Sequence, residues 1–271
     1  MRKAVLTIAG SDPSGGAGIQ QDIKVFTCLK LYACAAVTAL TVQNTQGVKS
    51  VNPVDPHLLE AQVRAVLEDI NISGIKIGML STEENVAALS RVLVLKNRAW
   101  VVADPVMRSK NNRVLLEYGA WRVYEEFLFP YVDILTPNVN EAEVISSFSI
   151  DSVEKMKEAA WVIQEKMTRN RMSIHEPGVY LKGGHLVKGK EVVDIFCYRG
   201  KITTLRGPRI ENVHTHGTGC TLSSALCSYF VTGEYPEEAA FKAKAFVSSA
   251  IKAGFALGKG IGPVDPLIFL K

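Results

Sequence analysis

The stretch AVLTIAGSDPSGGAGIQQDIKVFTCLK (residues 4–30) carries the pattern that decides the fold. Its first seven residues form a short apolar run, which predicts a buried strand. A loop rich in glycine, serine and proline follows, and apolar residues then recur at helical spacing at Ile19, Ile23 and Phe26. Strand, loop and helix in this order predict the first half of a βαβ unit, in which a helix covers a parallel sheet.

The same alternation continues along the chain. Apolar runs predict further strands at 35–42, 75–79, 100–106 and 132–138, and amphipathic segments predict helices at 16–30, 55–70, 82–97 and 153–167. Residues 192–207 instead show the alternation and tight turn of an antiparallel hairpin. The sequence therefore predicts an α/β fold with helices on both faces of a mainly parallel sheet and an antiparallel edge.

Bulk properties narrow the class of protein. With 271 residues and no internal repeat or flexible linker, we expect one domain over residues 1–271. The net charge of +4 is small and spread out, so we expect neither a nucleic-acid nor a membrane-surface partner. The five cysteines include no Cys-x-x-Cys pair, which argues against a disulfide framework or a zinc site. The chain shows neither a signal peptide nor an apolar span, so we expect a soluble cytoplasmic protein.

Polar residues and glycines gather where the predicted strands end. The segments concerned are GSDPSGGAG, QNTQG, GML, DPVM, TPNVNEAE and KGGH. In open α/β sheets, ligands bind beyond the carboxyl ends of the strands. The sequence therefore predicts a ligand site along that edge of the sheet.

The segment HTHGTGC (residues 214–220) resembles a phosphate cradle. It precedes a helical pattern, so backbone N–H groups at a helix N-terminus can approach an anion through Gly217, Thr218 and Gly219. The alternative is a glycine-containing turn that only packs against its neighbours. Neither a Walker motif nor the Rossmann fingerprint is present.

Cys220 lies in the first turn of that predicted helix, where the helix dipole favours a thiolate. Three interpretations remain open from the sequence. The cysteine can be a small packed residue, a proton acceptor for a substrate hydroxyl, or a covalent nucleophile assisted by His214 or His216.

Two polar residues suit a small heterocyclic ligand. Asp22 lies beside the apolar stripe of its helix, where a carboxylate needs a partner, either a ligand or nearby loop N–H groups. Gln43 follows the second predicted strand and offers a donor and an acceptor from one side chain, which suits an aminopyrimidine edge. The alternative is a glutamine at a strand end that only holds its loop.

A second set suits a nucleotide and its metal ion. Asp104, Asn138 and Glu141 offer oxygen ligands of the kind that Mg²⁺ uses beside phosphates, although Glu141 in the pattern N-x-x-E can instead cap a helix. Lys182 carries a compact charge suited to a phosphoryl oxygen.

Together, these segments resemble the hydroxymethylpyrimidine/phosphomethylpyrimidine kinases of thiamin biosynthesis. The matching stretches, in order, are LTIAGSDPSGGAGIQQDIK, TALTVQNTQGV, KIGML, DPVM, LTPNVNEAE, LKGGH, HTHGTGCTLSSA and GKGIGPV. The resemblance runs from about residue 3 to residue 266. It implies a ribokinase-like three-layer α/β/α fold, ATP and Mg²⁺ as cofactors, a small-molecule substrate and a homodimer. It also implies two successive phosphorylations, first of the hydroxymethyl group and then of the resulting monophosphate.

The resemblance also implies roles for single residues. Gln43 and Asp22 match substrate-binding positions, and Gly10, Val42, Met79 and Val106 match the pocket lining. Asn138 and Lys182 match nucleotide-binding positions, and Glu141 and Asp104 the metal site. Gly217, Thr218 and Gly219 match the anion hole, and Cys220 matches a catalytic position that carries aspartate in many sugar kinases of this fold.

Three other functions compete with this one. They are a pyridoxal kinase of the same fold, a nucleotide-binding sensor without turnover, and a hydrolase based on Cys220 and a histidine. The segments 108–113 and 168–178 depart from the family pattern. HEPGVY predicts either a short strand before Lys182 or a strand preceded by a mobile loop.

Overall fold

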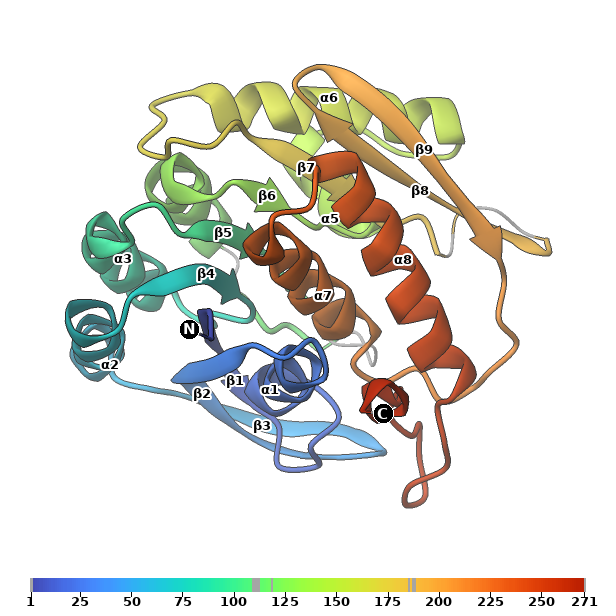
Figure 1. Ribbon diagram of the computed structural model, residues 1–271, viewed down its shortest axis with the longest axis horizontal. Helices are drawn as coiled ribbons and strands as arrows, with labels where there is room; N and C mark the ends of the chain where they lie inside the picture. The colour runs from blue at the N-terminus through green and yellow to red at the C-terminus, as the bar shows by residue number, and fades with distance from the viewer. Residues whose placement is uncertain (1, 109–112, 118, 185, 187–188, 271) are drawn as a thin grey trace.

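The computed structural model describes residues 2–108, 113–117, 119–184, 186 and 189–270. In this part of the chain nine strands form one sheet in the order β3-β2-β1-β4-β5-β6-β7-β8-β9 (Figure 1). The strands are β1 (Ala4–Ser11), β2 (Tyr32–Asn44), β3 (Gly47–Pro53), β4 (Ile72–Ile77), β5 (Trp100–Ala103), β6 (Ile134–Leu135), β7 (Gly178–Leu181), β8 (Glu191–Tyr198) and β9 (Lys201–Pro208).

The centre of the sheet is parallel, and both of its edges are antiparallel. Strands β2, β1, β4, β5, β6 and β7 pair in parallel. Strands β8 and β9 form the predicted antiparallel edge, and β7 is the short strand expected before Lys182. The second antiparallel edge, β3 on β2, was missed. Its residues are half-buried or exposed and show no apolar run, so QNTQG is a hairpin turn rather than a loop leading to a helix.

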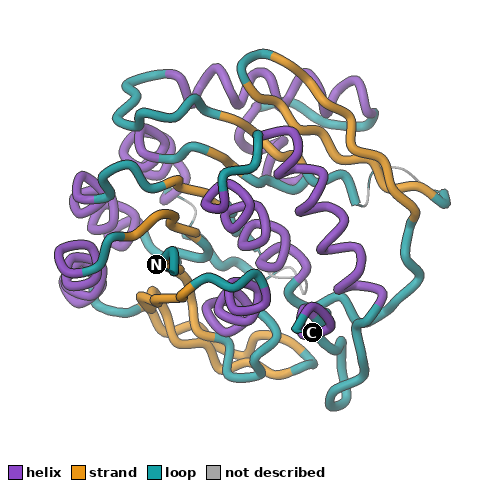
Figure 2. The backbone as a smooth tube through the Cα atoms, viewed as in Figure 1, coloured by secondary structure: helices purple, strands orange, loops and turns teal. Residues whose placement is uncertain are grey.

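Helices cover both faces of the sheet, as the three-layer fold requires. The helices are α1 (Gly18–Cys28), α2 (Pro56–Asp69), α3 (Glu83–Val92), α4 (Ala120–Val123), α5 (Val139–Ser146), α6 (Val153–Thr168), α7 (Thr218–Thr232) and α8 (Pro236–Lys252). Figure 1 shows α1, α7 and α8 in front of the sheet, and the remaining helices lie behind it or along its margin. The regular exchange of strand and helix along the parallel part is visible in Figure 2.

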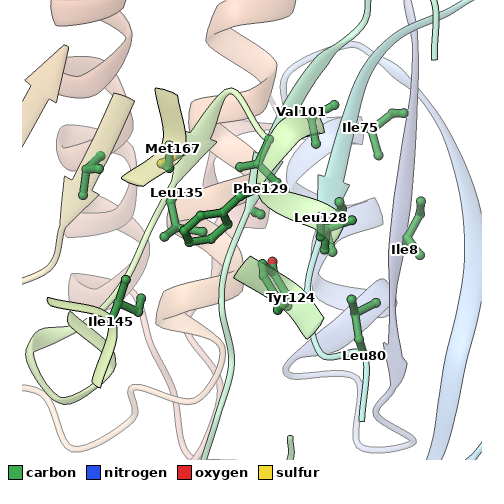
Figure 3. Close-up of a cluster of buried hydrophobic side chains, with 14 of the residues drawn as sticks. Ile8, Ile75, Leu80, Val101, Tyr124, Leu128, Phe129, Leu135, Ile145 and Met167 are labelled. Carbon is green, nitrogen blue, oxygen red and sulfur yellow. The ribbon is translucent and has the colours of Figure 1, made fainter. Parts of the chain in front are cut away.

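Each face of the sheet has its own apolar core. The larger one contains Ile8, Ile75, Val101 and Leu135 from the central strands, and Figure 3 shows these side chains beside aromatic and aliphatic residues of the covering segments. The smaller core joins α1, α7 and α8 to the opposite face. The central strands are therefore buried on both sides, which explains their nearly continuous apolar sequence. Among the described residues, no helix is long and apolar enough to cross a membrane.

Candidate active site

The helix α7 starts at a glycine that no other residue replaces without strain. Gly217 is its N-cap residue with a φ of +83°, a left-handed conformation that favours glycine. A Cβ at this position would also overlap the carbonyl oxygen of Gly16. No side chain in the described part of the chain caps this helix start, and the amides of the first helical turn have no acceptor within the helix. The predicted anion site at Gly217, Thr218 and Gly219 therefore has the required backbone geometry.

Gly219 brings this helix start against a charged pair. A Cβ on Gly219 would lie 3.1 Å from Oδ2 of Asp104 and 3.7 Å from Nζ of Lys182. Lys182 donates to Oδ1 of Asp104 at 2.7 Å, and Asp104 is 3% exposed. Burial acts to lower the pKa of Lys182, but Asp104 and Glu141 raise it above its ordinary value. The lysine therefore carries its positive charge beside the amides of α7.

Asn138 and Glu141 form a capping box at the start of α5. The Asn138 side chain accepts from the Glu141 amide at 2.9 Å, and the Glu141 carboxylate accepts from the Asn138 amide at 2.8 Å. This confirms the capping interpretation of N-x-x-E. Burial raises the pKa of Glu141 to about 7; Lys182 opposes this increase and Asp104 adds to it.

These residues suit a hydrated magnesium ion rather than a closed protein cage. Within the described part of the chain, no three His, Cys, Asp or Glu side chains cluster as a metal site would. Asp104 and Glu141 are nevertheless two buried carboxylates close enough to raise one pKa. The Tyr124 hydroxyl is buried near them and has no hydrogen-bond partner among the described residues. Burial raises its pKa, and both carboxylates add to the increase. Two carboxylates with water and phosphate as the other ligands match the way Mg²⁺ binds.

Cys220 corrects the expectation of a thiolate. Burial raises the pKa of its thiol to about 11, although the Lys76 ammonium acts to lower it. Asp22 and Asp104 add to the increase, and the Gly18 amide opposes it. The helix N-terminus acts to lower the pKa of the thiol, but burial and the neighbouring carboxylates outweigh this effect. Cys220 is a neutral thiol at pH 7.

The two histidines of the segment are occupied elsewhere. His216 contacts Asp12 and Gln43, and Nδ1 of His214 accepts from the Gly262 amide at 3.1 Å. In the described structure neither histidine makes a hydrogen bond to Cys220. The thiol hydrolase therefore lacks its base, which argues against that alternative.

Asp22 is buried in an ion pair that the sequence analysis missed. Its carboxylate, 0% exposed, accepts from Lys76 at 2.9 Å, from Thr7 at 2.6 Å and from Ser224 at 2.8 Å. The expected direct substrate contact of Asp22 is therefore corrected, because these three donors occupy a carboxylate that has no exposed surface. The only sequence signal for Lys76 was a lysine within an apolar strand, IKIGM.

Lys76 in turn is the buried cation of the site. It is 0% exposed and lies on β4, near Cys220 and Asp104. Burial acts to lower its pKa, but Asp22, Cys220 and Asp104 raise it above the ordinary value. A second positive charge therefore stands behind the start of α7 in addition to Lys182.

The pocket residues lie at the carboxyl ends of neighbouring strands. Gly10 is the last residue but one of β1, Met79 follows β4 and Val106 follows β5. A Cβ on Gly10 would overlap the methyl group of Met79, so these two residues are in close contact. Val42 is half exposed near the end of β2, next to Gln43, where a bulge shifts the pairing with β3. The parallel sheet thus brings the expected lining to one edge.

Gln43 is linked to residues far away in the sequence. Its amide lies 3.2 Å from Nε2 of His216, and the same nitrogen lies 2.8 Å from Oδ2 of Asp12. Burial acts to raise the pKa of Asp12, but hydrogen bonds from His216 and Ser14 lower it below its usual value. Asp12 and the link to Gln43 were not predicted, because separations of 204 and 173 residues leave no local pattern.

Comparison with known proteins identifies the family of the chain. Residues 12–265 match the family model described as phosphomethylpyrimidine kinase. The chain is 36% identical to the hydroxymethylpyrimidine/phosphomethylpyrimidine kinase of Haemophilus influenzae, over 97% of this chain and 96% of that protein. It is 41% identical to the thiamine biosynthesis bifunctional protein ThiED of Geobacter sulfurreducens, over 98% of this chain, and spans 53% of that longer protein.

A solved structure matches equally far along the chain. The pyridoxal kinase of Staphylococcus aureus in complex with ADP has a TM-score of 0.87 and 36% identity, covering 98% of this chain and 94% of the other. The fold is therefore that of the ribokinase-like kinases, as expected. With a family model spanning most of its length and relatives of this similarity, the chain belongs to the phosphomethylpyrimidine kinase family.

Proposed function

We propose that residues 1–271 act as one kinase domain. The protein transfers the γ-phosphoryl group of ATP to 4-amino-5-hydroxymethyl-2-methylpyrimidine, and then a second phosphoryl group to the monophosphate, giving the pyrophosphate used in thiamin biosynthesis. One observation carries the proposal: the start of α7 at Gly219 lies against the Asp104–Lys182 pair, at the sheet edge where Gln43 also lies. The names of the relatives from Haemophilus influenzae and Geobacter sulfurreducens support the substrate.

Lys182 and Asn138 serve the nucleotide in this proposal. The Lys182 amide donates to the Pro137 carbonyl at 2.8 Å, so the two residues come from adjacent chain segments. Among the described residues, no atom lies within 4 Å of a Cβ built on Gly184, which leaves space beside the lysine. The ADP complex of the similar Staphylococcus aureus kinase supports ATP as the donor.

Glu141 and Asp104 would hold the magnesium ion, with the nucleotide phosphates and water completing its ligands. When bound, the ion neutralises phosphate charge as the γ-phosphoryl group leaves ADP. Glu141 sheds its proton more readily as the pH rises through 7, since its pKa is about 7 without the ion. In the absence of the ion, Lys182 balances part of the negative charge of the two carboxylates.

The chain supplies positioning and charge rather than a strong base. The substrate oxygen forms a bond to the γ-phosphorus, and the bond from that phosphorus to the ADP oxygen breaks in a loose transition state. The hydroxyl proton passes late to an oxygen of the transferred phosphoryl group, so no strong base is required. The α7 amides and Lys182 stabilise the charge on the transferred group. The neutral Cys220 thiol stands at the third helical position and accepts or donates a weak hydrogen bond to the reacting oxygen.

A neutral thiol also suits the second phosphorylation. The acceptor is then a phosphate, which a carboxylate at position 220 would repel. With a pKa of about 11, the thiol adds no negative charge near pH 7. The cysteine thus allows one site to accept an alcohol and a phosphate in succession.

The remaining expectations concern assembly and location. We propose a homodimer that forms through β2, because Tyr32 and Leu40 are each 57% exposed there. Sedimentation velocity of the protein and of a Leu40→Asp variant tests this. Five unpaired cysteines support the cytoplasm as its location. The partners we propose are small molecules, not nucleic acid or membrane.

The test of function compares three acceptors. Purified protein with ATP and Mg²⁺ is incubated with the hydroxymethylpyrimidine, its monophosphate or pyridoxal, and ADP formation is followed. We expect turnover with both pyrimidines and little with pyridoxal. Turnover with pyridoxal alone would instead favour the activity named for the Staphylococcus aureus structure. Nucleotide binding without any turnover would favour a sensor.

A pair of lysine variants links activity to the site. Lys182→Met removes the cation beside α7. The control is Lys190→Met, which removes an exposed lysine that also precedes β8 in the sequence. We expect the first variant to lose ATP turnover and the second to keep it. Addition of EDTA should also abolish turnover, and excess Mg²⁺ should restore it.

A further inference from the structure

Four polar side chains form a continuous chain at the substrate end of the site. Oδ2 of Asp12 lies 2.8 Å from Nε2 of His216, and that nitrogen lies 3.2 Å from the Gln43 amide. The other side of the same amide lies 3.3 Å from Oγ1 of Thr41. Gln43 is thus in contact with a partner on each of its two terminal atoms.

The first partner requires an acceptor from Gln43. The Asp12 carboxylate can only accept, and its lowered pKa keeps it ionised, so Nε2 of His216 must carry a proton and donate it. The Gln43 nitrogen facing that N–H would place two donors against each other. A half-turn about the last side-chain bond exchanges nitrogen and oxygen, so that the Gln43 oxygen shares the single Nε2–H with Asp12 as a second, longer acceptor.

The second partner requires a donor from Gln43. Thr41 has one hydroxyl proton, which it donates to the Ser11 carbonyl at 2.9 Å. Its oxygen can then only accept from Gln43. Both neighbours therefore demand the same orientation, with the amide oxygen toward His216 and the nitrogen toward Thr41. One acceptor position on the oxygen and one donor position on the nitrogen stay available for a ligand.

His216 is held firmly at this place. A Cβ on Gly16 would overlap its ring, so the glycine loop packs directly against the imidazole. Its backbone accepts from the Val264 amide at 3.0 Å and donates to the Gly262 carbonyl at 3.1 Å. His216 also precedes Gly217, the start of the anion site. The side of Gln43 that faces His216 therefore faces the start of α7.

We propose that Asp12, His216 and Thr41 are positioning residues that fix the Gln43 amide and thereby the direction in which the substrate ring binds. This inference rests on the proposed function. The 4-amino group donates to the amide oxygen on the His216 side, and the neighbouring ring nitrogen accepts from the amide nitrogen on the Thr41 side. The hydroxymethyl group is on the ring carbon next to the amino group, on the side away from the ring nitrogen. It is therefore directed toward α7, where the phosphoryl group is transferred.

An analogue with reversed polarity tests this orientation. The 4-oxo analogue of the hydroxymethylpyrimidine presents an acceptor at position 4 and an N–H at the ring nitrogen, so it binds productively only if the amide turns around. We expect wild-type kcat/KM for the amino substrate to exceed that for the oxo analogue by about 100-fold or more, since a site built for one polarity rejects the other. His216→Phe removes one constraint and should lower this ratio by about tenfold, the factor expected for one unsatisfied polar contact.

Two further variants separate orientation from general damage. Thr41→Val keeps the branched shape, removes the second constraint and should also lower the ratio, and the double variant should lower it further. His214→Phe is the matched control, because His214 contacts Gly262 and not Gln43. It should change both substrates alike and leave the ratio unchanged.

Each outcome has one meaning. A ratio that stays within about twofold of wild type in both His216→Phe and Thr41→Val, or that His214→Phe lowers equally, overturns the orientation proposal while the kinase assignment stands. Wild-type protein that phosphorylates neither pyrimidine overturns the proposed function itself, and the ring direction with it. A fall in kcat/KM for both substrates by the same factor in His216→Phe also contradicts the proposal, because it marks a merely structural role.

Discussion

The buried pair of Lys76 and Asp22 gives the sharpest prediction about stability. Lys76→Met leaves the Asp22 carboxylate in the core without its cation, since both side chains are 0% exposed. Removing one partner of a buried ion pair costs about 3–5 kcal/mol. Thr7 and Ser224 still donate to the carboxylate, at 2.6 and 2.8 Å, so we expect a loss near the lower end, about 3 kcal/mol.

The assay is the free energy of unfolding in urea, with the melting temperature as a second measure. A loss of about 3 kcal/mol should lower the melting temperature by roughly 6–10 °C in a chain of this size. Lys201→Met is the matched control, because Lys201 pairs with Glu237 at 3.2 Å but is 70% exposed. Such an exposed pair contributes at most about 1 kcal/mol.

A double variant checks the cause. Lys76→Met with Asp22→Asn removes the uncompensated charge, so it should be more stable than Lys76→Met alone. A free energy of unfolding for Lys76→Met within about 1 kcal/mol of wild type would contradict the cost of an uncompensated buried charge, and so would a further loss of stability on adding Asp22→Asn. Lys76→Met should also slow alkylation of Cys220, because the lysine is the charge that lowers the pKa of that thiol.

Three further predictions concern the site. Alkylation of Cys220, which is partly exposed, by iodoacetamide should increase with pH up to about 11 rather than level off near the 8.5 of a free thiol, as followed by mass spectrometry. A plateau at pH 9 would contradict the raised pKa. Gly219→Ala should fold but lose ATP turnover, because its Cβ would lie 3.1 Å from Oδ2 of Asp104. Gly217→Ala should instead be strongly destabilised, because residue 217 has a φ of +83°. Thermal melting and activity assays distinguish the two effects. For Glu141 the pKa is raised in the folded state, so the folded protein binds its proton more tightly and wild-type stability falls as the pH rises from 4.5 to about 7. Glu141→Gln should therefore gain stability relative to wild type over that range, by up to about 1.4 kcal/mol per pH unit. Urea unfolding at several pH values measures this. Equal slopes of the free energy of unfolding against pH in the two proteins would refute the raised pKa.

The central sheet was predictable because its pattern is local. A strand buried on both faces needs a continuous apolar run, and its covering helix needs apolar residues at a period of 3.6. Both patterns are complete within a dozen residues, as in Ala4–Ser11 followed by Gly18–Cys28. Strand β3 escaped prediction for the same reason, because an exposed edge strand has no apolar requirement to leave in the sequence.

The capping box of α5 was also open to sequence reasoning, since Asn138 and Glu141 are three residues apart. From the sequence, Gly219, Asp104 and Lys182 could be predicted to lie at one edge of the sheet, but not to contact one another. The partners of Asp22 and Gln43 could not be predicted. Lys76 lies 54 residues from Asp22, and His216 lies 173 residues from Gln43.

By itself, the sequence determined the layers of this protein, the edge that carries its chemistry, and the glycines at the start of α7. Tertiary structure alone decided the charge states there. Cys220 carries a helix-start signal that favours a thiolate, yet burial beside Asp22 and Asp104 keeps it neutral. The physical reason is that a pKa depends on desolvation and on charges brought close by folding, and neither has a counterpart in the spacing of residues along a chain.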